Sequence, residues 1–196
     1  PVVDVTGFDQ RLGGAGNVAL NVKAMGAIPV LCSVVGQDKE GKDLRDIMIN
    51  NGLSCSGLIH SDKRKTTNKT RVLGNNHQLL RIDHEITTDL DVVDSFLLEQ
   101  RFAEELENCD VVIFEDYNKG VLHSKNIQTL IKKCLEKGIP TVVDPKKANF
   151  LEYKHVTLFK PNLKELKEGL GLHFSFSTSD GHFEAAVNQL ENELKN

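Results

Sequence analysis

Charged and amide side chains follow three apolar segments of the chain, and they are of the types that bind hydroxyl groups, phosphates and metal ions. The first segment ends at Glu115 and Asp116, the second at Asp144, and the third at Lys160 and Asn162. Continuous apolar runs of this kind are typical of buried parallel strands. In an open α/β sheet, ligands bind outside the carboxyl ends of the strands, so these side chains should converge on one site. The pattern indicates an enzyme that acts on a small polar or phosphorylated molecule.

Each of these strand ends also has a purely structural interpretation. Asp116 could accept hydrogen bonds from substrate hydroxyls, or it could serve as a turn residue or N-cap. Asn162 and Glu165 lie three positions apart at the predicted start of a helix, so both can face the same volume. Oxygen ligands of this type suit Mg²⁺ or its waters beside phosphates. A capping box explains the same pair without any ligand.

A glycine-rich stretch, Gly13-Gly14-Ala15-Gly16, precedes Asn17 and a predicted helix. Glycines allow backbone N–H groups to approach a ligand closely, and a helix N-terminus favours anions or hydroxyl oxygens. The stretch matches neither the Walker A pattern nor the dinucleotide-binding pattern. A tight strand–helix turn that needs small residues explains it equally well.

Three cations, Lys69, Arg71 and Arg81, lie in a predicted β-hairpin over residues 66–83, with turn-forming residues at its tip. Lys69 and Arg71 are two positions apart and therefore share a face of the hairpin. Such a flap could bind a phosphate or sugar hydroxyls. Isolated basic residues on a hairpin are more often a solvated face, so the sequence leaves both interpretations open.

Strands and helices that alternate along the chain must position these residues. A short strand and turn are predicted over residues 2–11, and further strands over residues 28–35, 110–114, 141–143 and 156–159. Helices are predicted over residues 17–25, 42–50, 89–107, 124–137 and 161–168. A last helix starts near residue 179 or 180, with Phe183, Val187, Leu190 and Leu194 facing inward. The alternation predicts a doubly wound, mostly parallel α/β sheet.

Composition excludes several classes of protein. The net charge of −4 argues against nucleic-acid binding, which needs a basic face, and no apolar run approaches the roughly 20 residues that span a bilayer. The 196 residues suffice for one domain with a sizeable core. The four scattered cysteines, Cys32, Cys55, Cys109 and Cys134, are typical of reduced thiols in a cytoplasmic protein.

At these residues the chain resembles the ribokinase-like (PfkB) carbohydrate kinases over nearly its whole length. The resemblance rests on Gly13-Gly14-x-x-Asn17, Gly36-x-Asp38-x-x-Gly41, the hairpin strands and Asn162-x-x-Glu165, in that order. Within the family, the chain is most similar to the D-glycero-β-D-manno-heptose 7-phosphate kinase domains of bifunctional ADP-heptose synthases. Residues 11–21, 69–72, 78–83 and 116–120 carry this narrower similarity.

The resemblance implies a kinase that uses ATP and Mg²⁺ to phosphorylate the anomeric hydroxyl of this phosphosugar, in the synthesis of ADP-heptose for lipopolysaccharide. The implied substrate-binding residues are Gly13, Gly14, Asn17, Lys69, Arg71, Arg81 and Asp116. The implied nucleotide-binding residues are Asp144, Lys146, Asn162, Leu163, Lys164 and Glu165. Asn162 and Glu165 would order Mg²⁺ through water. The resemblance also implies a small β lid, over about residues 1–11 and 66–85, on a core of about residues 12–65 and 86–196, with a homodimer formed through the lid strands.

The sequence departs from the family pattern at its end. The family's late Gly-Ala-Gly-Asp motif, which supplies the general base and an anion hole, has no match after Gly171. An early strand with a sugar-binding Asp would precede Pro1. We therefore expect a central part of the kinase domain that turns over negligibly by itself. Two alternatives remain open: another PfkB kinase, acting on fructose 6-phosphate, ribose or a nucleoside, and a non-catalytic sugar-binding or dimerisation module.

Overall fold

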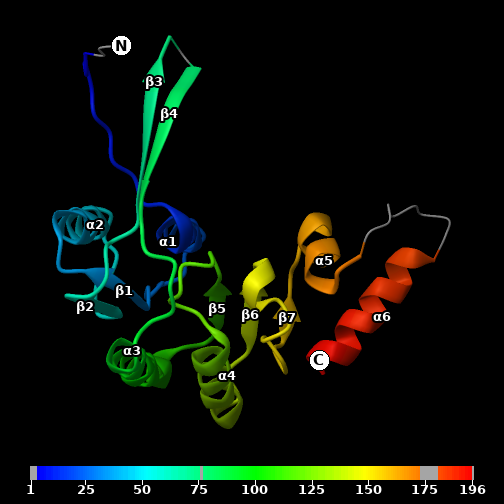
Figure 1. Ribbon diagram of the computed structural model, residues 1–196. Coiled ribbons are helices and arrows are strands. Elements are labelled where there is room, and N and C mark those ends of the chain that lie inside the picture. Colours follow the sequence, from blue (N-terminus) through cyan, green and yellow to red (C-terminus); the bar gives the residue numbers. More distant parts are fainter. Residues whose placement is uncertain (1–3, 76, 173–180, 196) are drawn as a thin grey trace. The chain divides into compact units, whose positions relative to one another are not determined.

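The computed structural model describes residues 4–75, 77–172 and 181–195 (Figure 1). The chain divides into two compact units, Pro1–His84 and Glu85–Asn196. Each unit contains parallel strands connected through helices, as the predicted alternation requires. Among the described residues, no helix combines the length and the apolar character that a bilayer-spanning segment needs.

The first unit contains a two-stranded parallel sheet, two helices and a hairpin. Its elements are α1 (Gly14–Ala24), β1 (Ser33–Gly36), α2 (Lys39–Asn50), β2 (Leu58–Ser61), β3 (Asn68–Gly74) and β4 (His77–His84). The sheet pairs β1 with β2 in parallel, with Ser33 opposite Leu58. Its core includes the buried side chains of Leu12, Ala19, Val35 and Met48.

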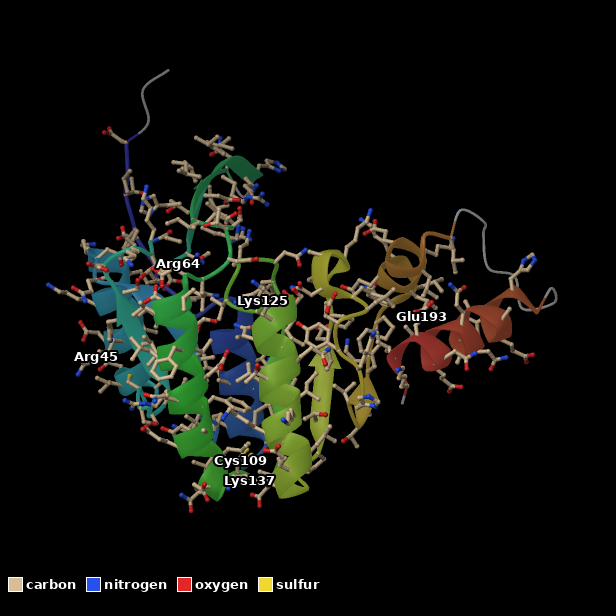
Figure 2. All side chains as sticks on the ribbon, turned by 60° about the horizontal axis from the view of Figure 1, so that its bottom comes forward. Arg45, Arg64, Cys109, Lys125, Lys137 and Glu193 are labelled. Atoms are coloured by element: carbon tan, nitrogen blue, oxygen red, sulfur yellow. The ribbon has the colours of Figure 1, made fainter. Side chains whose placement is uncertain are left out.

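The second unit is built on a three-stranded parallel sheet in the order β5-β6-β7. Its elements are α3 (Val92–Glu105), η1 (Leu106–Asn108), β5 (Val112–Glu115), α4 (Ser124–Lys137), β6 (Thr141–Asp144), η2 (Lys147–Asn149), β7 (Leu158–Phe159), α5 (Leu163–Leu170) and α6 (His182–Leu194). Helices α3 and α4 pack side by side (Figure 2), and α5 packs against α6. All three strands point the same way, so their carboxyl ends share one edge of the sheet.

Helix α4 shows why the sequence forms these elements locally. Ile127, Ile131 and Cys134 recur at helical spacing and are all buried. The helix ends at Gly138, whose φ of 66° is the left-handed conformation that glycine adopts most readily. The predicted N-cap was one residue late, because the cap is His123 rather than Ser124.

Several predicted elements differ from the structure. Of the short strand and turn predicted over residues 2–11, the described part contains no strand, since residues 4–13 have no regular secondary structure. The strand predicted over residues 28–35 is only β1, preceded by an isolated bridge from Val30 to Ser54. Strand β2 was not predicted. In α6, Phe183 is 49% exposed and Ala186 takes the inward position instead.

Candidate functional site

Acidic and basic side chains meet at the carboxyl ends of β5 and β6. Glu115 lies directly opposite Asp144 in the parallel register, and Lys160 Nζ lies 3.7 Å from Asp144 Oδ1. Burial raises the pKa of Glu115, and the negative charge of Asp144 raises it further. Two neighbouring carboxylates that repel each other in this way attract cations, so this edge of the sheet can hold positively charged groups.

An ion pair connects the end of β6 to helix α5. Lys146 Nζ donates a hydrogen bond to Glu165 Oε1, and Glu165 is buried to 8% exposure. Burial raises the pKa of Glu165, but the N–H of Asn162 and the ammonium of Lys146 outweigh it and hold the pKa below its usual value. Glu165 is therefore ionised at neutral pH.

Asn162 and Glu165 form a complete capping box at the start of α5. Asn162 Oδ1 accepts a hydrogen bond from the Glu165 N–H at 2.9 Å, and Glu165 Oε2 accepts one from the Asn162 N–H at 2.9 Å. The structural explanation offered by the sequence is thus realised, because the pair satisfies two donors of the first helical turn. The cap also fixes both side chains at the strand edge, with Asn162 exposed and Glu165 buried.

The chemistry of this donor set decides whether Mg²⁺ fits. Asn162 Oδ1 and both oxygens of Glu165 already accept hydrogen bonds from protein groups. Within the described ranges, no three His, Cys, Asp or Glu residues are grouped so that they could hold a metal ion. Mg²⁺ keeps several waters and binds proteins through few carboxylates, so the residues fit an ion held through its water shell beside phosphates.

Asp116 lies at the end of β5 and is buried to 3% exposure. Its Oδ1 accepts the Asn118 N–H at 2.8 Å, and its Oδ2 accepts Asn149 Nδ2 at 2.9 Å and Tyr153 Oη–H at 2.8 Å. A carboxylate offers roughly four acceptor positions, so about one remains, on Oδ1. Asp116 fixes the loop that follows β5. Its binding of a sugar hydroxyl stays a prediction.

Helix α5 borders a hollow of about 300 Å³. Its lining residues are Lys147, Lys164, Lys167, Glu168, Gly171 and Leu172. Lys164, one of the predicted nucleotide-binding residues, is among the lysines that line this hollow. Leu163, another of the predicted nucleotide-binding residues, does not line it, and its side chain is 51% exposed. Three lysines against one glutamate give the hollow an excess of positive charge, which suits an anionic ligand alongside α5.

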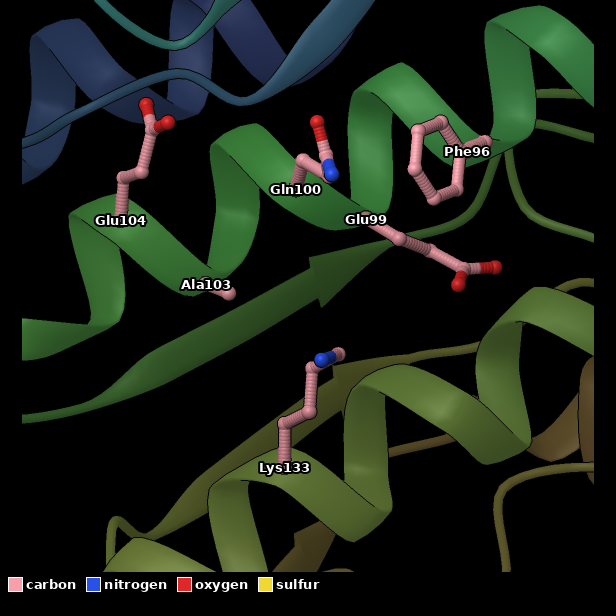
Figure 3. A pocket seen from close by; sticks show the side chains of 6 residues that line it. All are labelled: Phe96, Glu99, Gln100, Ala103, Glu104 and Lys133. Carbon is pink, nitrogen blue, oxygen red and sulfur yellow. The ribbon is translucent and has the colours of Figure 1, made fainter.

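A second hollow of about 390 Å³ lies between α3 and α4 (Figure 3). Its lining residues are Phe96, Glu99, Gln100, Ala103, Glu104 and Lys133. None of the predicted site residues lines it. It therefore does not belong to the site at the strand ends.

The glycine turn lies in the first unit, at the start of α1. Gly13 is the N-cap and makes no side-chain cap, Gly14 has a φ of 52°, and Asn17 is exposed one turn later. A Cβ placed on Gly13 would meet no other atom within 4 Å. No neighbouring atom therefore demands glycine at this position, and binding of a ligand at the N-terminus of α1 stays a prediction.

The hairpin brings its three cations together. Arg71 lies opposite Arg81 in the register, and Lys69 lies opposite Asp83. Asp83 accepts Lys69 Nζ at 3.0 Å and pairs with Arg81 Nε at 3.1 Å. The hydrogen bond from Lys69 and the charges of both cations lower the pKa of Asp83. Three cations share this face with one carboxylate, so it keeps an excess of positive charge.

The Gly36-x-Asp38-x-x-Gly41 motif is a tightly packed turn. Asp38 caps α2 by accepting the Gly41 N–H at 2.8 Å, and its other oxygen accepts the Thr66 N–H at 2.8 Å. A Cβ on Gly41 would lie 2.3 Å from the carbonyl oxygen of Gly36. The motif requires glycine there because backbone approaches backbone.

Asp38→Ala is expected to lower the free energy of unfolding by about 2 kcal/mol at pH 7, because two N–H groups lose their acceptor. Burial raises the pKa of Asp38, but the hydrogen bonds from Thr66 and Gly41 outweigh it and lower the pKa overall. The stabilisation is therefore present above the unfolded pKa of about 4 and is lost as pH falls through the folded pKa.

Urea unfolding at pH 7 and at pH 3 measures this difference. The gap between the Asp38→Ala variant and the unaltered protein should shrink at the lower pH. Asp46→Ala, at an exposed position of the same helix, is the matched control. A loss of equal size in both variants would contradict the capping role.

Structures of sugar kinases share this fold. The tetrameric inhibited form of phosphofructokinase-2 from Escherichia coli matches with a TM-score of 0.71 and 16% identity, covering 100% of this chain and 65% of that chain. A 2-dehydro-3-deoxygluconokinase from Thermotoga maritima matches with a TM-score of 0.71 and 12% identity, covering 96% and 62%. At these identities the likeness shows the fold alone, and it confirms the predicted ribokinase-like α/β architecture.

The model of the pfkB family of carbohydrate kinases matches residues 1–195, and the chain belongs to this family. Its relatives include the bifunctional protein HldE of Campylobacter curvus, 38% identical over 194 residues, which are 98% of this chain and 40% of that protein. HldE of Coxiella burnetii is 43% identical over 171 residues, 87% of this chain and 35% of that protein. The chain thus spans well under half the length of these relatives.

The sequence did not reveal the partners that hold the site in place. Tyr153 and Asn149, which bind Asp116, lie 37 and 33 residues further along the chain. Glu85, which pairs with Lys119, lies 34 residues before it. No local spacing signals these pairs, because each depends on how separate elements pack.

Proposed function

We propose that the protein uses ATP and Mg²⁺ to phosphorylate D-glycero-β-D-manno-heptose 7-phosphate at its anomeric hydroxyl, a step towards ADP-heptose. The observation that carries the proposal is the Lys146–Glu165 pair, which joins the Asn162 capping box at the strand ends. It occurs in a chain of the pfkB family whose relatives include HldE proteins. The narrower choice of sugar rests on the similarity of residues 69–72, 78–83 and 116–120 to heptose 7-phosphate kinases.

In this proposal the second unit binds the nucleotide. Glu165 and Asn162 hold hydrated Mg²⁺ beside the phosphates, where the ion neutralises negative charge. Lys146 is anchored by Glu165 and presents its ammonium next to Asp144. Burial lowers the pKa of Lys146, but its hydrogen bond to Glu165 and the nearby carboxylates outweigh it and raise the pKa, so the side chain stays charged. The proposal gives this chain residues that bind and orient the substrates, and it names none of them as a general base.

The hairpin has two different faces, and each suits a different partner. Lys69, Arg71 and Arg81 lie on one face and supply the charge for the sugar 7-phosphate. The opposite face carries Val72, with Leu80 and Ile82, which are 55% and 51% exposed. An apolar face of this kind is suited to a second copy of the chain, so we propose a homodimer through β3 and β4.

Glu165→Gln in the full-length protein is expected to lower kcat about 100-fold, with little change in KM for the sugar, because the charge that orders the ion is lost. The amide keeps one oxygen for the cap but loses the one that accepts from Lys146 Nζ, so the thermal midpoint should fall modestly. ADP release measures the rate. Glu184→Gln, at an exposed position of α6, is the control and should keep nearly full activity.

The substrate is tested by comparing kcat/KM for heptose 7-phosphate, fructose 6-phosphate, ribose and adenosine. The proposal expects the highest value with heptose 7-phosphate. A higher value with fructose 6-phosphate or ribose would assign the chain to a different sugar kinase. Binding without ADP release from any of the four would favour a sugar-binding module.

A further inference from the structure

The segment that follows the hairpin lies along the loop after β5. Glu85 Oε1 accepts a hydrogen bond from Lys119 Nζ at 2.6 Å, and the Leu90 N–H donates to the Gly120 carbonyl at 3.0 Å. Between these two points, a Cβ on Gly120 would lie 1.9 Å from the Thr88 carbonyl oxygen. Two hydrogen bonds and one close backbone approach therefore join residues 85–90 to residues 119–120, and both segments lie within the second unit.

The same loop is fixed at its other end and carries an unsatisfied group in its middle. Asp116 accepts the Asn118 N–H and ties the loop to Asn149 and Tyr153. Asn118 has a φ of 51°, and its Oδ1 is buried without a hydrogen-bond partner among the described residues. A buried acceptor without a donor is costly. A hydroxyl group that reaches this loop would supply the donor.

The Glu85–Lys119 pair is better shielded than a comparable pair in the same unit. Its side chains are 17% and 26% exposed, whereas those of Glu107 and Lys137, which pair at 2.7 Å, are 64% and 39% exposed. Partly buried charges are screened less by water, so removing one partner costs more. Glu85 is the first residue after β4, and both members of the pair belong to the second unit.

We propose that Glu85 and Lys119 are positioning residues that hold residues 85–90 against the Asp116 loop and so govern how tightly the sugar is held. This inference rests on the proposed function and extends it. The loop that carries Asp116 and Asn118 accepts a substrate hydroxyl only where its backbone is held in place, and the pair supplies a fixed attachment next to it. Loosening the pair should therefore weaken sugar binding.

The attachment is tested by amide hydrogen exchange in the full-length protein. Lys119→Met keeps most of the side-chain stem and removes the charge, and it should speed exchange of the Leu90 N–H about tenfold, as expected for a lost charged hydrogen bond. Glu85→Gln should act in the same direction, and the reversed pair Lys119→Glu with Glu85→Lys should restore protection. Lys137→Met is the control and should leave Leu90 unchanged. Unchanged exchange in both Lys119→Met and Glu85→Gln would overturn the attachment.

The positioning role is tested by kinetics on the same variants. Lys119→Met should raise KM for heptose 7-phosphate about tenfold and leave KM for ATP within about twofold. Faster exchange at Leu90 with an unchanged KM for the sugar would overturn the positioning role. An unaltered protein that phosphorylates no sugar would overturn the proposed function, while the exchange result would still decide the attachment.

Discussion

Asp116→Ala is expected to lower the free energy of unfolding by about 3 kcal/mol or more, because it removes the acceptor of three hydrogen bonds. Tyr153 is fully buried, and Asn149 is half-buried. The Tyr153 hydroxyl and the Asn149 amide would both lose Asp116 Oδ2 as their acceptor, at a place where water can hardly replace it. The loop from Asn118 would also lose its anchor. Kinase activity of the full-length protein should fall with it, because the loop borders the proposed sugar site.

Urea unfolding followed by circular dichroism measures the loss for Asp116→Ala. Asp110→Ala, at an exposed position just before β5, is the matched control and should cost less than about 0.5 kcal/mol. Asp116→Asn should fall between them, because it keeps one acceptor oxygen but places an amide NH₂ group beside other donors. Equal midpoints for Asp116→Ala and Asp110→Ala would show that the network contributes nothing to stability.

Gly120→Ala is expected to destabilise the protein by about 3 kcal/mol, through two effects that add. Gly120 has a φ of 73°, a backbone conformation that residues other than glycine rarely adopt. Its new methyl group would also lie 1.9 Å from the Thr88 carbonyl oxygen, so the backbone of one segment must move. The contact from Leu90 to the Gly120 carbonyl would be lost in that movement.

Thermal unfolding of Gly120→Ala should show a clear fall in the midpoint. Gly138→Ala is the control, since Gly138 has a similar φ of 66° but a Cβ there meets no atom within 4 Å. The difference between the two variants isolates the clash from the cost of the backbone conformation. If both variants lose the same stability, the approach of Thr88 is not as close as the structure places it.

Local patterns in the sequence predict much of the second unit. The apolar spacing of α4, its stop at Gly138 and the Asn162–Glu165 cap each depend on residues within a few positions of one another. Such signals depend on residues in neighbouring turns of one helix, so they can be recognised in the sequence without the tertiary structure. The parallel order of β5, β6 and β7 follows from the alternation of strand and helix.

Strand pairing shows where the local pattern is insufficient. The apolar residues near the start of the chain predict a strand, yet residues 4–13 have no regular secondary structure. Strand β7 is only Leu158–Phe159, because pairing with β6 stops there. A strand exists only where a neighbour accepts and donates its backbone hydrogen bonds, and a single segment carries no information about that neighbour.

By themselves, the residues of this chain determined the family, the βα order and which side chains carry charge to the strand ends. Tertiary structure alone decided what holds those side chains. Asp116 has partners 33 and 37 residues away, and Lys119 has one 34 residues away. These bonds form between elements that the burial of apolar surface brings together. Because this force is non-directional, the polar residues that it places in contact have no regular spacing in the sequence.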